Sequence, residues 1–392
     1  MNRTVSDVQS PAQALPGQSL TKGAAGMALL PIEDALSGAG TWHAAHAWLT
    51  AATGAEISAA DTACLSYGAP AVAFALHCAQ ADGTPRYGAP LDVLHQHVTG
   101  VARRRLRAAH ARIDHGVPPA FAEYDLLHGL TGIGAYLLRR EPAGDMLREV
   151  LTYLVRLTRP LVISGQELPG WWCGHDPQVR QSHGFPGGHA NFGIAHGISG
   201  PLALLAQAAR HGVTVEGQGD AMGVITRWLH TWRQDSATGA WWPQWITRRE
   251  LAAGRSDQRR PARPSWCYGT PGLARAQQLA ALALDDSTGR RAAETALLQA
   301  LTDPRQLAQI TDTSLCHGWA GLYQTGWRTA QDAATDNIHR ALTAVEPRLA
   351  PPPDAPNTEL GFLEGTTGGA LVLRTVTHGT APRSGWDAFL LI

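Results

Sequence analysis

Two cysteines and one histidine stand directly before glycine turns in the second half of the sequence. Cys267 lies in the stretch SWCYGTPG, and Cys316 and His317 lie in the stretch TSLCHGWAGL. Two thiolates and one imidazole suit Zn²⁺, and three protein ligands leave the fourth tetrahedral position open, as in catalytic zinc sites. Their separation in the sequence is not typical of zinc motifs, so the two cysteines could instead be small buried apolar residues. Whether the three side chains meet depends on the elements that carry them.

These turns belong to a repeat. Gly-x-x-Gly followed by an apolar helical run occurs seven times, with first glycines Gly23, Gly68, Gly129, Gly197, Gly269, Gly318 and Gly365. The second copy is weaker, because Ala71 replaces its second glycine. Other stretches with helical periodicity lie between the copies, and strand-like alternation is scarce. Each unit therefore predicts two helices, one begun by the glycine turn and one more amphipathic.

Seven such units at variable spacing favour a closed all-α ring over an open solenoid, which tends to keep a uniform period and needs polar end repeats. In this α/α toroid, the helices that follow the glycine turns would lie inside and the amphipathic helices outside. Glycine would let the chain turn sharply and let the inner helices approach closely. Closure would place all seven turns at one end of the ring. Cys267 of the fifth turn would then lie beside Cys316 and His317 of the sixth, which favours the zinc site.

The residue before each first glycine is never aliphatic, although alanine and leucine surround the turns. These residues are, in order, Lys22, Tyr67, His128, His196, Tyr268, His317 and Glu364. Helix capping and loop polarity would explain any one of them. For the set, convergence on a functional site is the better explanation. Asp125, four positions before Gly129, joins this group.

Composition narrows the class of protein. The 392 residues are 44% hydrophobic and 16% charged, which excludes a wholly disordered chain. Basic and acidic residues number 32 each, so charge gives no reason to expect nucleic acid or an anionic membrane as partner. The start of the chain has no apolar signal segment, and no apolar run reaches the ~18 residues of a membrane span. Five scattered cysteines fit a reducing cytoplasm, where they stay free for metal binding or catalysis.

The motifs together resemble one family. SWCYGTPG and LCHGWAGL, with NFGIAHGISG and YDLLHGLTGIGAYLL upstream, are similar to motifs of the zinc-dependent lanthionine synthetase C-like family. The resemblance extends from Gly23 to about Leu373. It implies an α/α toroid of about seven inner and seven outer helices, which agrees with the repeat. We expect a single toroid domain over residues 19–392 after a flexible segment, residues 1–18.

The resemblance also implies roles for individual residues. Cys267, Cys316 and His317 match the zinc ligands of the family. His196, in AHG, matches its active-site histidine, and Asp125, in YDLLHG, matches its active-site aspartate. From the residues alone, His196 could be a core histidine and Asp125 a helix cap.

Three further positions have more than one interpretation. Arg263 falls where the family has a functional arginine, although it lies in an arginine-rich stretch that also reads as a loop. Tyr268 follows the first ligand cysteine as in the family, but could equally be a packing residue. His128 departs from the best-known member, which has an acidic residue there, so its role stays open. Loop positions are expected for the histidines of a glycine-rich stretch, where they could form a rim that contacts a peptide: His175, His183 and His189.

Members of this family add a cysteine thiol of a peptide to dehydroalanine or dehydrobutyrine and so close thioether rings. The resemblance therefore predicts a free-standing Zn²⁺-dependent lanthipeptide cyclase, which forms lanthionine or methyllanthionine rings in a dehydrated ribosomal precursor, as in antibiotic (lantibiotic) biosynthesis. No dehydratase segment precedes the toroid, so a separate dehydratase, and an exporter of the same pathway, are the expected partners. The expected location is the cytoplasm, either free or with a membrane-bound biosynthetic complex.

Two alternatives remain open. The protein could add glutathione or another free thiol to dehydroamino acids. It could also be a non-enzymatic toroid that binds a peptide beside a dehydratase.

Overall fold

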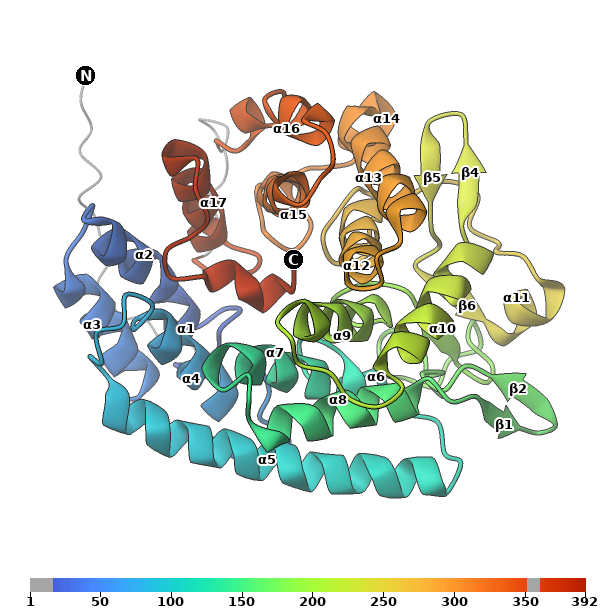
Figure 1. Ribbon diagram of the computed structural model, residues 1–392, viewed down its shortest axis with the longest axis horizontal. Helices are drawn as coiled ribbons and strands as arrows, with labels where there is room; N and C mark the ends of the chain where they lie inside the picture. Colours follow the sequence, from blue (N-terminus) through green and yellow to red (C-terminus); the bar gives the residue numbers. More distant parts are fainter. Residues whose placement is uncertain (1–16, 351–359) are drawn as a thin grey trace.

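Helices dominate the structure and lie in two concentric layers (Figure 1). The structure, a computed structural model, describes residues 17–350 and 360–392. Apart from its last two residues, the predicted flexible segment 1–18 lies outside the described residues. The layers confirm the α/α toroid predicted from the glycine repeat.

The inner layer consists of the helices that follow the seven glycine turns. They are α1 (Ala24–Met27) with α2 (Leu29–Ser37), α4 (Ala69–Cys78), α7 (Leu130–Arg140), α9 (Ser199–Arg210), α12 (Thr270–Ala283), α15 (Trp319–Gln331) and α17 (Thr366–His378). Each contacts the next, and α17 contacts α2, so the ring is closed. The outer layer contains α3 (Trp42–Ala52), α5 (Gly88–Asp114), α8 (Asp145–Leu157), α10 (Gln218–Thr231), α13 (Ser287–Thr302) and α16 (Asn337–Leu342).

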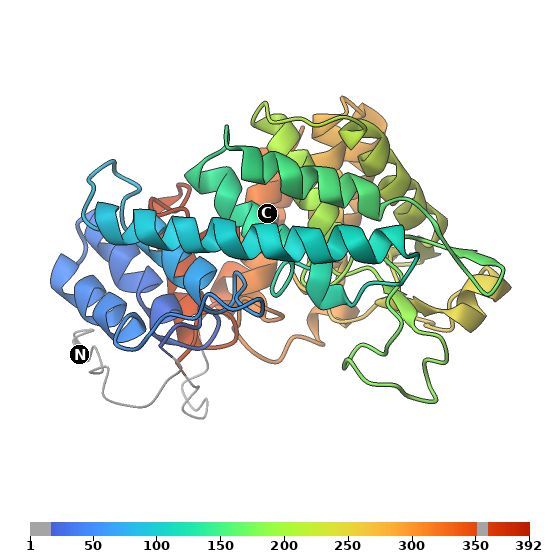
Figure 2. The same ribbon diagram turned by 90° about the horizontal axis from the view of Figure 1, so that it is seen from below.

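The two layers differ in which residues their helices bury. In α4, with the sequence APAVAFALHC, every residue except His77 is buried, as expected for a helix surrounded by protein. In α5, the buried residues lie on one face and include Leu91, Val98 and Leu106. That face packs on α4, α7 and α8. Figure 2 shows α5, in cyan, running along much of the width of the molecule.

Close backbone contacts explain the second glycine of the repeat. A Cβ atom on Gly272 would lie 1.9 Å from the carbonyl oxygen of Trp266, six positions earlier, and one on Gly321 would lie 1.9 Å from that of Leu315. The other second glycines meet the carbonyl six positions earlier in the same way. The weak second copy has a different turn, in which Gly68 takes φ +77°, a conformation that favours glycine. Ala71 is accommodated there.

Backbone hydrogen bonds join the seven turns into a closed ring. In every turn, the carbonyl two positions before the first glycine accepts an N–H from the preceding turn. Cys267 donates to Cys316 at 3.2 Å, and Cys316 donates to Leu363 at 2.9 Å. Leu363 of the last turn donates to Thr21 of the first at 3.1 Å, which completes the circle. The convergence of the turns therefore has a specific backbone cause.

Short helices and strands fill the connections. The helices are α6 (Phe121–Tyr124), α11 (Arg248–Ala253), α14 (Pro304–Leu307) and the 3₁₀ turn η1 (Glu346–Arg348). In the part of the chain that the structure describes, three antiparallel pairs of strands occur that the sequence did not predict: β1 (Leu161–Ile163) with β2 (Gln166–Leu168), β3 (His189–Asn191) with β6 (Trp245–Thr247), and β4 (Gln234–Ser236) with β5 (Gly239–Trp241).

After α17, the described chain turns inward and ends with the 3₁₀ helix η2 (Trp386–Leu390) in the centre of the ring (Figure 1). Trp386, Phe389 and Leu390 are fully buried there. The indole N–H of Trp266 donates to the carbonyl of Leu390 at 2.9 Å. This segment therefore packs against the residue that precedes Cys267.

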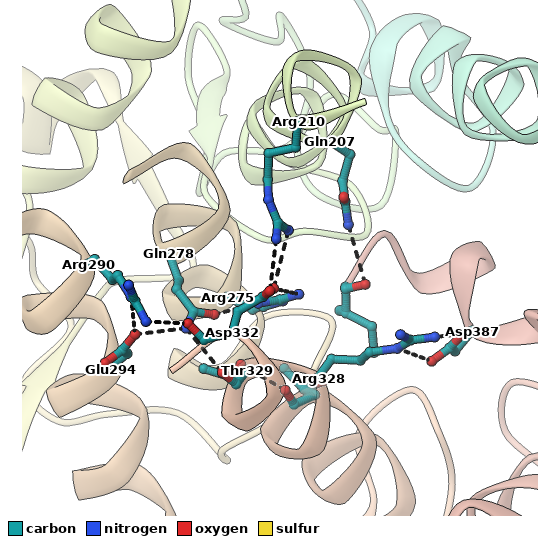
Figure 3. A network of polar contacts seen from close by, with 12 residues as sticks. Gln207, Arg210, Arg275, Gln278, Arg290, Glu294, Arg328, Thr329, Asp332 and Asp387 are labelled. Atoms are coloured by element: carbon teal, nitrogen blue, oxygen red, sulfur yellow. Dashed lines mark hydrogen bonds and ion pairs between the residues drawn. The ribbon is translucent and has the colours of Figure 1, made fainter. Parts of the chain in front are cut away.

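Ion pairs tie the inner helices together and to this segment (Figure 3). Asp332 lies 2.8 Å from the guanidinium groups of both Arg210 and Arg275. Asp387 of η2 pairs with Arg328 of α15 at 2.6 Å.

Among the described residues, no helix combines the length and the apolar composition that crossing a membrane requires.

Candidate metal centre and the side chains around it

The structure brings Cys267, Cys316 and His317 together. Their sulfur atoms and one imidazole nitrogen all lie within 4.8 Å of one another. Cys267 is buried, whereas Cys316 and His317 are partly exposed. The three residues come from the consecutive turns before α12 and α15, which the hydrogen bond between Cys267 and Cys316 holds side by side. Two sulfurs and one imidazole at this spacing fit a Zn²⁺ ion with one position left for a further ligand.

The electrostatics of the cluster favour a thiolate. Hydrogen bonds from Cys316 and His317 lower the pKa of the Cys267 thiol despite its burial. The pKa of Cys316 is raised, first because of its hydrogen bond with Cys267. The thiolate form is therefore favoured at Cys267 and opposed at Cys316. The pKa of His317 is raised by its hydrogen bond with Cys267. A cation is the natural partner of this charge, which supports the fit of the donor set to a metal.

Asp312 connects the candidate ligands to Arg263. Its Oδ2 lies 3.6 Å from Nε2 of His317 and 3.8 Å from Nη1 of Arg263. Its other oxygen accepts the backbone N–H of Ser314 at 2.8 Å, which fixes the carboxylate. Sequence reasoning missed Asp312. One signal was present: ligating histidines usually face a carboxylate with their second nitrogen, and Asp312 is the acidic residue nearest to His317 in the sequence.

Asp125 is fully buried and uses its two oxygens differently. Oδ1 accepts the backbone N–H groups of His128 and Gly129 at 2.6 and 2.7 Å, so Asp125 does cap its turn. Oδ2 lies 2.6 Å from Nδ1 of His196. Burial opposes the charged form, but hydrogen bonds from His128 and His196 outweigh it and lower the pKa of Asp125. Asp125 is therefore ionised at neutral pH and orients His196 with Nε2 left for other contacts.

Tyr268 lies between the two groups. It follows Cys267 in the chain, and its ring lies 6.2 Å from that of His196, centroid to centroid. Its hydroxyl oxygen accepts a hydrogen bond from the side-chain amide of Asn191 at 3.1 Å. Burial raises the pKa of Tyr268, so the hydroxyl keeps its proton and can donate it in a hydrogen bond. Asn191 is a second residue that sequence reasoning missed, since it lies in the unpredicted strand β3.

A cavity of about 330 Å³ opens at this site. It is lined by Gln244, Ala262, Arg263, Ser265, Cys267, Tyr268 and Gln309. Arg263, Cys267 and Tyr268 therefore face one space, although His196 and Asp125 are not part of its wall.

The three histidines expected in a loop differ in their surroundings. His183 is exposed and His175 is half-buried. His189 is fully buried in β3, opposite Thr247 of β6, so the loop prediction was wrong for this residue. Burial lowers the pKa of His189 to about 4, and its Nδ1 lies 2.7 Å from the carbonyl of His175. His189 is thus an uncharged residue of the fold and not part of an exposed rim.

Comparisons with known proteins agree with this architecture. The family model described as lanthionine synthetase C-like protein matches residues 16–391. The nisin biosynthesis protein NisC of Lactococcus lactis subsp. lactis is 28% identical over 269 residues, which are 67% of this chain and 61% of that protein. The match thus spans less than two thirds of this relative. A solved structure of nisin cyclase has a TM-score of 0.81 at 23% identity, covering 97% of this chain and 93% of that one, which shows the fold. Because the family model matches nearly the whole sequence, the chain belongs to the lanthionine synthetase C-like protein family.

Proposed function

We propose that the protein is a zinc-dependent lanthipeptide cyclase. It would add cysteine thiols of a dehydrated precursor peptide to dehydroalanine or dehydrobutyrine. The observation that carries this proposal is the meeting of Cys267, Cys316 and His317 within 4.8 Å, beside the Asp125–His196 pair. Family membership supports it, because the similar proteins are named a nisin biosynthesis protein and a nisin cyclase.

The donor set suits a sulfur nucleophile. A free cysteine thiol with a pKa of about 8.5 is only a few per cent ionised at neutral pH. Zn²⁺ held by Cys267, Cys316 and His317 would supply the missing ionisation, because a coordinated thiol loses its proton. Two negatively charged ligands weaken the activation of water, so the same set argues against a hydrolase, which more often uses histidine and carboxylate ligands.

His196 is the proposed general acid. The addition breaks an S–H bond and a C=C π bond and forms S–C and C–H bonds, so a proton must reach Cα. A positioned histidine is the side chain that most often delivers such a proton. Asp125 holds Nδ1 of His196 at 2.6 Å, which leaves Nε2 for the substrate.

Arg263 and Tyr268 are the proposed donors to the developing enolate oxygen. Both line the cavity at Cys267. Fixed donors directed at developing charge are usually the largest electrostatic contribution to catalysis. Arg263 lies beside Asp312, and burial raises the pKa of Tyr268, so that its hydroxyl keeps the proton while Asn191 donates to its oxygen and holds it in place.

The same proposal includes the origin of the substrate. A separate dehydratase would supply the dehydroamino acids, with an exporter acting on the product. A cytoplasmic location is part of the proposal, since thiols must stay reduced both in the substrate and in the candidate metal site.

A dehydrated precursor peptide that contains cysteine tests this function. Ring closure leaves the peptide mass unchanged and removes one alkylatable thiol for each ring, so mass spectrometry after thiol alkylation counts the rings. We expect rings with the zinc-loaded protein and none after zinc is removed with a chelator. Unchanged thiol counts with the zinc-loaded protein would contradict the proposal.

Two further samples separate the alternatives. A dehydrated peptide without cysteine, incubated with glutathione, gains the mass of glutathione if the protein transfers free thiols. Binding of the dehydrated peptide without either reaction would indicate a non-enzymatic peptide-binding toroid.

Replacing Asp312 with asparagine is expected to weaken zinc binding by about 10- to 100-fold, the usual effect of removing a carboxylate that faces a ligating histidine. The variant keeps the side-chain size and an oxygen for the N–H of Ser314. Competition with a chromophoric chelator measures the affinity. Asp336→Asn, at the N-terminal end of α16, is the matched control and should bind zinc like the unmodified protein. Equal affinities in all three proteins would show that Asp312 does not support His317.

A further inference from the structure

His128 lies beside the proposed acid, and its role has not been assigned. It precedes Gly129, in the turn that also carries Asp125. Its side chain is 48% exposed, whereas that of His196 is 22% exposed and that of Asp125 is fully buried. His128 is therefore the solvent-facing member of a group of three titratable side chains.

Both imidazoles share one carboxylate oxygen. Nδ1 of His196 lies 2.6 Å from Oδ2 of Asp125, and Nδ1 of His128 lies 3.4 Å from the same atom. Oδ1 is already occupied by two backbone N–H groups. The two rings are stacked, with centroids 5.4 Å apart and planes 12° apart. Only one oxygen thus remains to compensate two imidazoles.

His128 and His196 compete for the negative charge of Asp125. The hydrogen bond to Asp125 raises the pKa of His128, against the opposing effects of burial and of the positive charge of Arg105 of α5. The charged form of His128 is therefore favoured by its contact with Asp125. One buried carboxylate neutralises one imidazolium, and a second positive charge 5.4 Å away opposes the first. Interacting groups of this kind titrate as a set. No hydrogen bond of either imidazole in the described structure reaches Cys267, Cys316 or His317.

We infer that His128 is a positioning residue that sets the proton affinity of His196 by competing for the Asp125 carboxylate. When His128 is charged, His196 gives up its proton more readily, which suits donation to Cα of the substrate. This inference rests on the proposed function, in which His196 is the acid.

Two substitutions change the charge in opposite senses. His128→Asn keeps a hydrogen-bonding side chain next to Asp125 and removes the charge. His128→Lys keeps a positive charge throughout the neutral range. The turn should survive both, because the hydrogen bond from residue 128 to Oδ1 of Asp125 comes from the backbone N–H. Circular dichroism and zinc content check that each variant folds.

The experiment is an NMR titration of the zinc-loaded protein with isotope-labelled histidine, in which the His196 signal is the one absent from His196→Ala. We expect the midpoint of His196 to rise by on the order of one pH unit in His128→Asn and to fall in His128→Lys. His128→Gln should repeat the rise. Midpoints that stay within about 0.2 pH unit of the unmodified protein in all three variants would overturn the inference.

Turnover gives a second measurement. An acid works only while protonated, so the decline of the cyclisation rate at high pH should move upward in His128→Asn and downward in His128→Lys, in step with the NMR midpoints. Shifted midpoints in a protein that forms no rings would refute the proposed function and leave the coupling intact. Ring formation with unshifted midpoints would refute the coupling alone.

Discussion

Replacing Cys267 or Cys316 with alanine is expected to lower bound zinc from about one ion per chain to nearly none, and to abolish ring formation. Each substitution removes one of three donor atoms that lie within 4.8 Å of one another. Two remaining ligands cannot hold Zn²⁺ against water and buffer, since stable protein sites use three or four. Elemental analysis of the purified variants measures the metal, and thiol alkylation with mass spectrometry measures the rings.

A matched control separates the loss of a ligand from the loss of a buried cysteine. Cys78 is another free and fully buried cysteine, on the inner helix α4. Cys78→Ala likewise removes one buried sulfur atom from the core, and this variant should bind zinc like the unmodified protein. Full zinc content in both Cys267→Ala and Cys316→Ala would rule out the metal site, whereas zinc loss in Cys78→Ala as well would point to general unfolding.

His196→Ala is expected to keep its zinc and to cyclise the peptide about 10²- to 10⁴-fold more slowly, the usual contribution of a positioned general acid. The separation of the two effects follows from the structure. His196 belongs to the Asp125 group, and the backbone bond from Leu126 to Ala195 that holds its turn does not involve its side chain. Zinc analysis and a time course of ring formation give the two values from one preparation.

His211→Ala is the control for this variant. His211 is an exposed histidine directly after α9, the helix that follows His196, and its Nδ1 lies 2.7 Å from the carbonyl of Gln207. We expect normal zinc content and normal rates. Undiminished ring formation by His196→Ala would show that His196 takes no part in the mechanism. Loss of zinc in that variant would show that His196 also supports the candidate zinc ligands.

The toroid was predictable because its cause is local and repeated. Each second glycine lies against the carbonyl of the residue six positions earlier, as Gly272 does against Trp266, which leaves no room for a Cβ atom. Both partners of this contact lie within one short motif, so the sequence shows it. The number of motifs predicted a closed ring of helices. Closure of the ring then predicted that Cys267 lies beside Cys316 and His317 of the next turn. The placement of His196 beside Asp125 was implied by family resemblance, and the periodicity alone left both residues with structural roles.

The rest depended on contacts that no local pattern records. Strand β3 has three residues, too few to show an alternation, and its pairing with β6 joins segments far apart in the sequence. The burial of His189 and the contact of Asn191 with Tyr268 follow from that pairing. Asp312 reaches His317 through the shape of one turn, and the sharing of Asp125 by two imidazoles requires two turns to be adjacent.

The circle of backbone hydrogen bonds holds the seven turns in place without using the side chains proposed for catalysis. Its donors and acceptors are main-chain atoms, so the positions of the seven turns do not depend on which side chains precede the glycines. Ligands, acid and tyrosine occupy some of these equivalent positions, and an ion pair between Lys22 and Glu364 occupies two others. One frame can therefore present different reactive groups at fixed spacings, and a new activity would require exchanging side chains at these positions without redesigning the ring.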